Sequence, residues 1–278
     1  MALKLDLVGK KSAPLSFRYT WKDAVLYALG VGATAAELDF LFEMRGPRVL
    51  PTFAVVPSFS AMISIASDLG ADPTMIVHGE QKIVLFGPIP GEATLTTTAE
   101  VKAVYDKGKG AVVLVEAHTV DERGEPRFDN QFSIFVRGGG GFGGDRGPEA
   151  PRLDPPEGQP PDFAISQATT PEQALLYRLS GDYNPLHADP GFAKVGGFDR
   201  PLLHGLCTYG FAGRAVLAGA CGGDERRLKS FAARFSAPVF PGDTLTTRGW
   251  KRGDGSFLVT VSTQDGKQVL SNAVAEVA

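Results

Sequence analysis

Residues 238–247, PVFPGDTLTT, nearly repeat residues 88–97, PIPGEATLTT, at an offset of about 150 positions. The same offset places ALLYRLSG, residues 174–181, over AVLYALGV, residues 24–31. Because the matched segments recur in the same order and at the same spacing, we interpret them as an internal duplication. The fold should therefore contain two copies of one unit.

Each copy shows helical patterns followed by long alternating strands. In the second copy, residues 171–179 are amphipathic, and residues 206–220 are apolar all round, which indicates an enclosed helix. Turn dipeptides such as Asp254-Gly255 separate the strands that follow. These predicted strands span 230–237, 244–251, 257–263 and 269–277. We predict an α+β fold in which an antiparallel sheet wraps one helix in each of two adjacent copies.

A segment rich in Gly and Pro separates the two copies and excludes a helix or a central strand there. We therefore predict a first copy at 1–136, a linker at 137–161 and a second copy at 162–278. The linker begins with GGGGFGG, and its Phe142 leads us to expect that this part packs along the first copy.

Composition narrows the class of protein. With 278 residues, 43% of them hydrophobic, the chain can bury a full core in one large domain or in two. Its 28 basic and 31 acidic residues give a net charge of −3, and no Lys/Arg cluster is interleaved with aromatic residues, which argues against nucleic acid. The sequence also bears on cellular location. No apolar run approaches the roughly 18 residues of a membrane span. The N-terminus lacks a signal-peptide core, and the C-terminus is no Ser-Lys-Leu address. We expect a soluble cytoplasmic protein, with the peroxisome as the alternative.

The cysteines, Cys207 and Cys221, are too few for a disulfide scaffold, and neither belongs to a CxxC pair. We expect reduced core thiols and no metal site.

A polar cluster, GDYNPLH, occurs only in the second copy. It places a carboxylate, an amide and an imidazole within six residues, at Asp182, Asn184 and His187. Pro185 fixes its own φ and so predicts a stiff turn. Such residues in a turn often only cap a helix. However, the first copy has Gly32 opposite Asp182 and manages without the cluster, so we interpret it as an acid–base site.

The segment from Tyr177 to Gly205 resembles the signature of the MaoC-like, hydratase-2 family, the (R)-specific 2-enoyl-CoA hydratases, which includes the hydratase unit of peroxisomal multifunctional enzyme type 2. The resemblance covers nearly the full chain through four further segments. They are VHGEQKIVLFGPIP from Val77, DKGKG from Asp106, NQFSIFVRGGGGFGG from Asn130 and ARFSAPVFPGDTL from Ala233. It implies a double hot-dog fold with the catalytic motif in the C-terminal copy.

The resemblance also implies roles for individual residues. Asp182 and His187 would be the catalytic pair, Asn184 would help to hold the attacking water, and the Gly205 N–H would bind the thioester oxygen. It implies acyl-CoA contacts at His78, Gly79, Lys107 and Phe235. Within and beside the motif, we expect further substrate contacts from Tyr177, Tyr183, Pro185 and Leu186. No cofactor is expected, because coenzyme A is part of the substrate.

The expected reaction is hydration of trans-2-enoyl-CoA to (3R)-3-hydroxyacyl-CoA, and its reverse. Two alternatives stay open, a hot-dog acyl-CoA thioesterase and a non-catalytic acyl-CoA binding module. Nearby His204 is interpreted as a structural hydrogen-bonding residue, and a homodimer is expected. Apolar residues of the first copy predict a space for the acyl tail. They are Phe40, Leu41, Phe42, Met44, Val55 and Met62.

Overall fold

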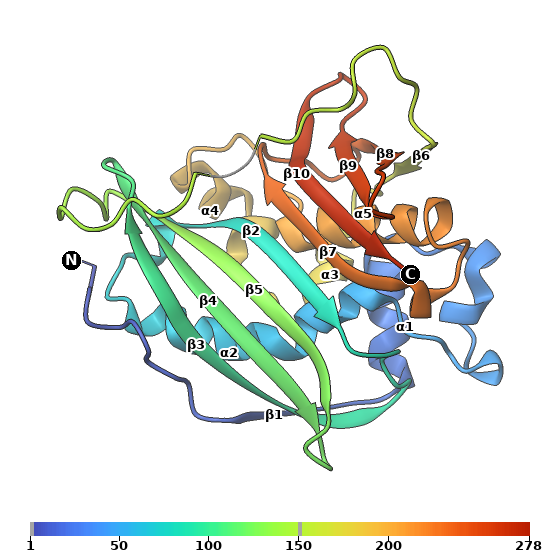
Figure 1. The fold of residues 1–278 in the computed structure, drawn as a ribbon, viewed down its shortest axis with the longest axis horizontal. Coiled ribbons are helices and arrows are strands. Elements are labelled where there is room, and N and C mark those ends of the chain that lie inside the picture. Colours follow the sequence, from blue (N-terminus) through green and yellow to red (C-terminus); the bar gives the residue numbers. More distant parts are fainter. Residues whose placement is uncertain (1–2, 150–151) are drawn as a thin grey trace.

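The structure, a computed structural model, describes residues 3–149 and 152–278 and is built on one antiparallel sheet (Figure 1). The ten strands follow the order β1-β3-β4-β5-β2-β7-β10-β9-β8-β6. The first half contributes β1 (Leu15–Tyr19), β2 (Ile76–Leu85), β3 (Ala93–Asp106), β4 (Gly110–Asp121) and β5 (Pro126–Arg137). The second half contributes β6 (Phe163–Ala168), β7 (Leu228–Phe235), β8 (Thr244–Lys251), β9 (Phe257–Ser262) and β10 (Gln268–Val277). The halves meet where β2 pairs with β7.

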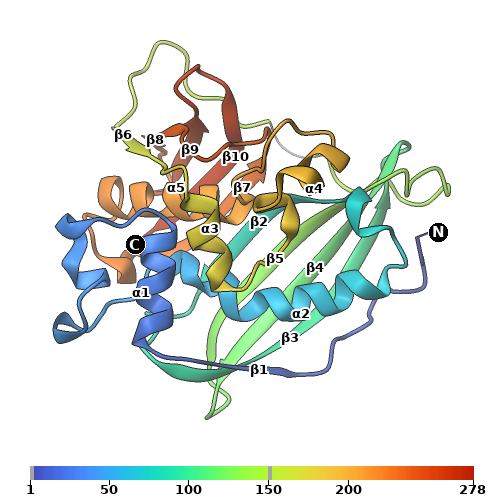
Figure 2. The same cartoon turned by 180° about the vertical axis from the view of Figure 1, so that it is seen from behind.

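The sheet curves around two long helices, one in each half (Figure 2). The first half has α1 (Trp21–Gly30) and α2 (Val55–Asp68). The second half has α3 (Gln173–Tyr177), α4 (Pro190–Val195) and α5 (Gly205–Gly219). A core cluster around α5 joins residues of both halves, and a second cluster lies between α2 and strands β3, β4 and β5. None of the helices among the described residues is long and apolar enough to cross a membrane.

The two halves repeat one another closely. Helices α2 and α5 begin at Val55 and Gly205, which are 150 positions apart (205 − 150 = 55). Counted outward from the central β2–β7 pair, the strands also follow the same chain order in each half. This arrangement confirms the duplication, the α+β class and the double hot-dog prediction. Edge strands β1 and β6 and the short helix α4 were not expected from the sequence pattern.

Small residues on α5 let it pack closely against the first half. A Cβ at Gly210 would lie 2.3 Å from a methyl carbon of Val31, and a Cβ at Gly213 would lie 2.4 Å from one of Thr52. Larger side chains would push the helix away from these segments. The apolar character predicted for this helix therefore serves an interface between the two copies.

The first part of the linker packs along the first half, as the position of Phe142 led us to expect. The Asp106 carboxylate accepts hydrogen bonds from the N–H groups of Gly141 and Gly143 at 2.8 and 2.7 Å. Residues 150 and 151 lie outside the described part of the chain.

The proposed apolar space of the first half is not formed by the six residues expected to line it. Val55 lies in the core cluster around α5, whereas Met62 lies in the cluster under α2. Met44 is 79% exposed. Packing against different neighbours separates these side chains, so the prediction of a common lining was wrong.

Candidate active site

The polar cluster lies on a rigid turn that follows α3. The helix continues as the 3-10 turn Arg178–Ser180 and ends at Gly181, whose φ of 119° is in the left-handed region. The next 3-10 turn, Pro185–His187, is capped by Asn184, whose side-chain oxygen accepts from the Leu186 N–H at 3.0 Å. This confirms the stiff turn predicted from Pro185.

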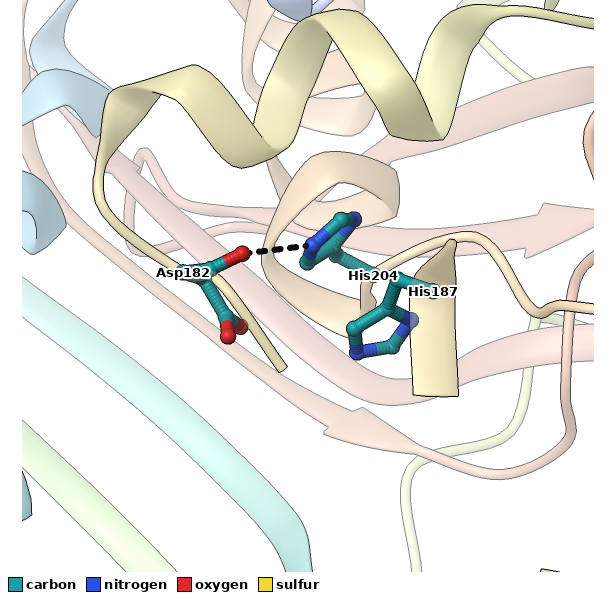
Figure 3. Close-up of side chains that lie close together, drawn as sticks. All are labelled: Asp182, His187 and His204. Carbon is teal, nitrogen blue, oxygen red and sulfur yellow. Dashed lines mark hydrogen bonds between the residues drawn. The ribbon is translucent and has the colours of Figure 1, made fainter. Parts of the chain in front are cut away.

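The turn brings Asp182 and His187 together, and the N-terminus of α5 adds His204 (Figure 3). One possible ligand atom from each of these side chains lies within 4.8 Å of the other two. His187 Nδ1 lies 3.0 Å from the Leu202 carbonyl oxygen. Because a carbonyl oxygen only accepts, Nδ1 carries the proton, and Nε2 is the bare nitrogen of the neutral ring. The Asp182 carboxylate and the His187 ring thus face each other with Nε2 free for chemistry.

Burial shifts the pKa values of this pair in opposite directions. Desolvation raises the pKa of Asp182, and the positive charge of His187 works against that rise. Desolvation also lowers the pKa of His187, against the influence of the Asp182 charge. Both shifts favour the uncharged forms, because charge is poorly solvated here. The two groups are close enough to titrate as a pair and to exchange one proton.

His204 is almost fully buried, at 1% exposure, and packs directly on the pair. Its Nε2 lies 3.1 Å from the Asp182 backbone oxygen, so Nε2 donates to that carbonyl. Its ring stacks on His187 with centroids 3.7 Å apart and planes at 27°. Burial, followed by the charge of His187, lowers the pKa of His204 to about 2. The expectation that His204 is a hydrogen-bonding residue is therefore confirmed.

The same three side chains make a poor metal site despite their proximity. His187 Nδ1 and His204 Nε2 donate to backbone carbonyls, which leaves His187 Nε2 and His204 Nδ1 as the possible ligand atoms. The two rings stack face to face, whereas a metal needs their in-plane lone pairs to converge on one point. The donor set fits an acid–base pair better than a metal centre.

Gly205 is the first residue of α5 and directly follows His204. An N–H in the first turn of a helix has no acceptor within that helix and can bind a ligand oxygen. A Cβ at Gly205 would lie 3.2 Å from the ring of Phe235 at the end of β7. The Phe235 ring in turn meets the His78 ring of β2 edge-on, with centroids 4.9 Å apart. His78, a side chain of the first half, thus lies next to Phe235 and Gly205 of the second half.

The local backbone of β2 explains the position of His78. The register of the β2–β5 pair shifts between His78 and Glu80, so Gly79 is the extra residue of a β-bulge. A Cβ at Gly79 would lie 3.2 Å from the Ser133 carbonyl oxygen, which leaves little room for a side chain. Burial lowers the pKa of His78 to about 4, so this ring is neutral at physiological pH.

Comparison with known proteins agrees with this geometry. Residues 17–138 match the family model described as the MFE-2 hydratase 2 N-terminal domain, and residues 152–273 match the MaoC like domain. A probable enoyl-CoA hydratase 2 of Dictyostelium discoideum is 41% identical over 97% of this chain and 94% of its own. The chain belongs to the MaoC-like hydratase-2 family. The recognition made from the sequence is thereby confirmed.

Two further relatives support this membership. The peroxisomal multifunctional enzyme type 2 of Mus musculus is 40% identical over 97% of this chain, which corresponds to 38% of that longer protein. The crystal structure of a MaoC-like dehydratase from Phytophthora capsici covers 99% of this chain and 98% of its own, with a TM-score of 0.90 and 34% identity.

The remaining residues expected to contact substrate are spread around the hydratase-2 motif. Tyr177 is 3% exposed, and its ring packs 4.9 Å from that of His204, behind the pair. Tyr183 is 59% exposed, and the Arg178 guanidinium lies 5.3 Å from its ring centroid. Pro185 is exposed and Leu186 half-buried in the capped turn.

Lys107 is not brought to the pair by its observed contacts. It lies on the turn between β3 and β4, where its amino group donates to the Arg146 carbonyl of the linker. Its Nζ also lies 5.6 Å from the Tyr105 ring. A contact from Lys107 to coenzyme A therefore stays a prediction.

The counterpart of the GDYNPLH turn in the first half is filled. The 150-residue offset places Glu37 opposite His187 (187 − 150 = 37), and Glu37 pairs with Arg214 of α5. A Cβ at Gly32, opposite Asp182, would lie 2.4 Å from the Phe211 ring. The sequence analysis did not predict that Arg214 and Phe211 fill this position, although the 150-residue offset pointed to Glu37.

Proposed function

We propose that this chain catalyses the reversible hydration of trans-2-enoyl-CoA to (3R)-3-hydroxyacyl-CoA, as the names of its hydratase relatives suggest. The observation that carries the proposal is the Asp182 carboxylate facing the free Nε2 of His187 across the GDYNPLH turn. Both groups are uncharged by preference and lie within reach of one water molecule. A module that only binds an acyl-CoA would have no use for this pair.

The reaction needs three groups, and the site offers candidates for each. One member of the Asp182–His187 pair takes a proton from water while the water oxygen bonds to C3. The other member gives a proton to C2, and the C2–C3 double bond becomes a single bond. Proton exchange within the pair then restores its starting state. The product has therefore gained only the atoms of one water molecule, OH at C3 and H at C2.

Negative charge develops on the thioester oxygen between C3 attack and C2 protonation. We propose that the Gly205 N–H stabilises this oxygen, because the N-terminus of α5 presents a free donor and the positive end of the helix dipole. A Cβ at Gly205 would lie 3.2 Å from the Phe235 ring, so glycine avoids crowding next to this donor. Asn184 keeps its amide N–H₂ available for the attacking water, since its side-chain oxygen is used in capping.

The assay that tests the proposal uses crotonyl-CoA and a longer trans-2-enoyl-CoA. Hydration removes the absorbance of the conjugated enoyl thioester without releasing a thiol. Release of free coenzyme A would instead indicate a thioesterase, and binding without either change would indicate a non-catalytic module. Chiral analysis of the product then checks the 3R configuration, and a 3S product would contradict the proposed specificity.

We further propose that no metal or nicotinamide takes part, because the addition of water to a polarised double bond is redox-neutral and needs only an acid, a base and a donor for the thioester oxygen. Extensive dialysis against EDTA should leave the hydration rate unchanged. The proposed assembly is a homodimer, which light scattering can test. Cytoplasm stays the proposed location, with the peroxisome as the alternative because the mouse relative is named peroxisomal.

A further inference from the structure

His204 lies at the centre of the site without a step of its own in the proposed reaction. It is the buried neighbour of both reacting groups, since Nε2 meets the Asp182 backbone oxygen and its ring face meets His187. The Tyr177 ring packs against it as well. A side chain enclosed in this way controls where its neighbours can lie.

The tautomer of His204 follows from these contacts. Nε2 must carry the proton, because its partner is a carbonyl oxygen. Nδ1 is buried and has no hydrogen-bond partner among the described residues. A second proton on Nδ1 would bury an unpaired N–H and place a positive charge against the His187 ring. The geometry therefore keeps this imidazole neutral.

We propose that His204 is a positioning residue, a permanently neutral imidazole that fixes the Asp182 main chain and the His187 ring plane so that both groups face one water. It acts through its two neighbours and does not touch the substrate. The kinetic part of this proposal rests on the proposed hydration reaction, whereas the protonation state of His204 does not.

Few groups near the stacked rings can change their charge at working pH. The titratable or charged side chains that act directly on the stacked rings are Asp182, Arg178 and Tyr177, and Tyr27 of α1 and Cys207 of α5 lie next to Tyr177. Burial raises the pKa of both tyrosines and of the thiol, so they stay neutral. Arg178 stays cationic. Proton exchange is therefore confined to Asp182 and His187.

The protonation state can be measured without any assay of activity. The chain has four histidines, so ¹⁵N-histidine labelling gives a simple NMR titration. His204 should keep a proton on Nε2 and a bare Nδ1 from pH 5 to 9. A His204 ring that titrates in this range, or that carries its proton on Nδ1, would overturn the proposal.

Three substitutions separate the two contacts of His204. His204→Gln keeps an amide N–H near the place of Nε2, His204→Phe keeps a stacked ring without the donor, and His204→Ala loses both. Because misplacement by about 1 Å can cost about 100-fold in rate, we expect kcat to fall about 100-fold in the Ala variant and about tenfold in the other two. KM should change less than kcat. His118→Gln is the matched surface control.

The pH profile distinguishes positioning from a merely structural role. In His204→Ala, water can enter beside His187, so the lowered pKa of His187 should rise towards its ordinary value of 6.5. The acid limb of kcat/KM then moves to higher pH, whereas His204→Phe, which keeps the ring buried, leaves it in place. A structural role alone would reduce the folded fraction and leave the profile of the folded protein unchanged.

Two outcomes would refute the kinetic part. One is a folded Ala variant with wild-type kcat and acid limb, and the other is a loss of kcat that follows only the folded fraction measured by circular dichroism. If the wild-type chain does not hydrate enoyl-CoA, the proposed function fails, and the NMR titration still decides the state of His204.

Discussion

If Asp182 and His187 act on one water, removing both should cost no more than removing one. The variants are Asp182→Asn and His187→Asn, singly and together. The new amide at 182 can still accept from the Asn184 N–H, which lies 3.3 Å from the carboxylate. The new amide at 187 takes the place of Nδ1, so it can still donate to the Leu202 carbonyl. Both substitutions remove a group that can exchange a proton and keep the hydrogen bonds of the turn.

The expected magnitude follows from the geometry. A positioned acid or base contributes about 10²–10⁴-fold, so each single variant should lose about 2.7–5.4 kcal/mol of transition-state stabilisation. Two independent groups would lose the product, about 10⁴–10⁸-fold, in the double variant. Because the reacting atoms lie within 4.8 Å of each other, we expect strong coupling and a double variant no slower than about 10²–10⁴-fold.

The measurement is the initial loss of enoyl thioester absorbance at saturating substrate, with thermal melts by circular dichroism to confirm folding. His118→Asn, on the exposed face of β4, is the control and should keep full activity. A double variant that loses the full product of the two single losses would refute a shared water. A folded single variant with near wild-type turnover would remove that residue from the pair.

Three further predictions follow from packing. Glu37→Gln leaves the buried Arg214 guanidinium without its counter-charge and should lower the free energy of unfolding by about 3–5 kcal/mol in urea titrations, with partial recovery when Arg214→Met is added. Gly205→Ala brings a methyl group to 3.2 Å from the Phe235 ring and should lower kcat at unchanged stability; wild-type kcat would show that the approach beside Gly205 is not used. Cys207, fully buried with its pKa raised by burial, should resist iodoacetamide at pH 8 until urea unfolds the chain, and rapid native labelling would contradict the described packing.

The sequence predicted the repeated architecture because its signals are local. Each signal depends only on residues nearby in the chain: the alternating strands, the turn dipeptides and the apolar helix. Because these signals recur after 150 residues, they predict two copies of one unit. Both cysteines are free and buried, as expected. Short edge strands escaped notice because five or six residues with one exposed face carry little periodic signal.

The site was predictable where the motif itself carries the chemistry. A stiff turn with Asp182 and His187 needs only local geometry, and the structure shows the two side chains facing each other. The stack with His204 depends on how α5 meets the turn, and no pattern within one segment reports such a contact. The prediction that six apolar residues line one space was wrong for the same reason, because the directions of their side chains depend on long-range packing.

The comparison of the two halves explains why the chain has one candidate site and not two. In the first half, the position opposite His187 carries Glu37, which holds the Arg214 guanidinium of α5 in an ion pair. Arg214 also donates to the Val31 carbonyl at 2.9 Å, so it crosses the space between the halves. Together with the Phe211 ring, this side chain fills the place where a second acid–base pair would need to lie.

The corresponding positions of α2 in the first half carry small residues. The α2 positions that correspond to Phe211 and Arg214 are Ala61 and Ser64 (211 − 150 = 61 and 214 − 150 = 64). Both side chains are short and uncharged, so neither can supply a ring or a cation like those of Phe211 and Arg214. Large side chains at these two positions of α5 alone therefore account for the filled counterpart in the first half. The Glu37–Arg214 ion pair thus occupies the counterpart in the first half, whereas the second half keeps the polar groups of the GDYNPLH turn.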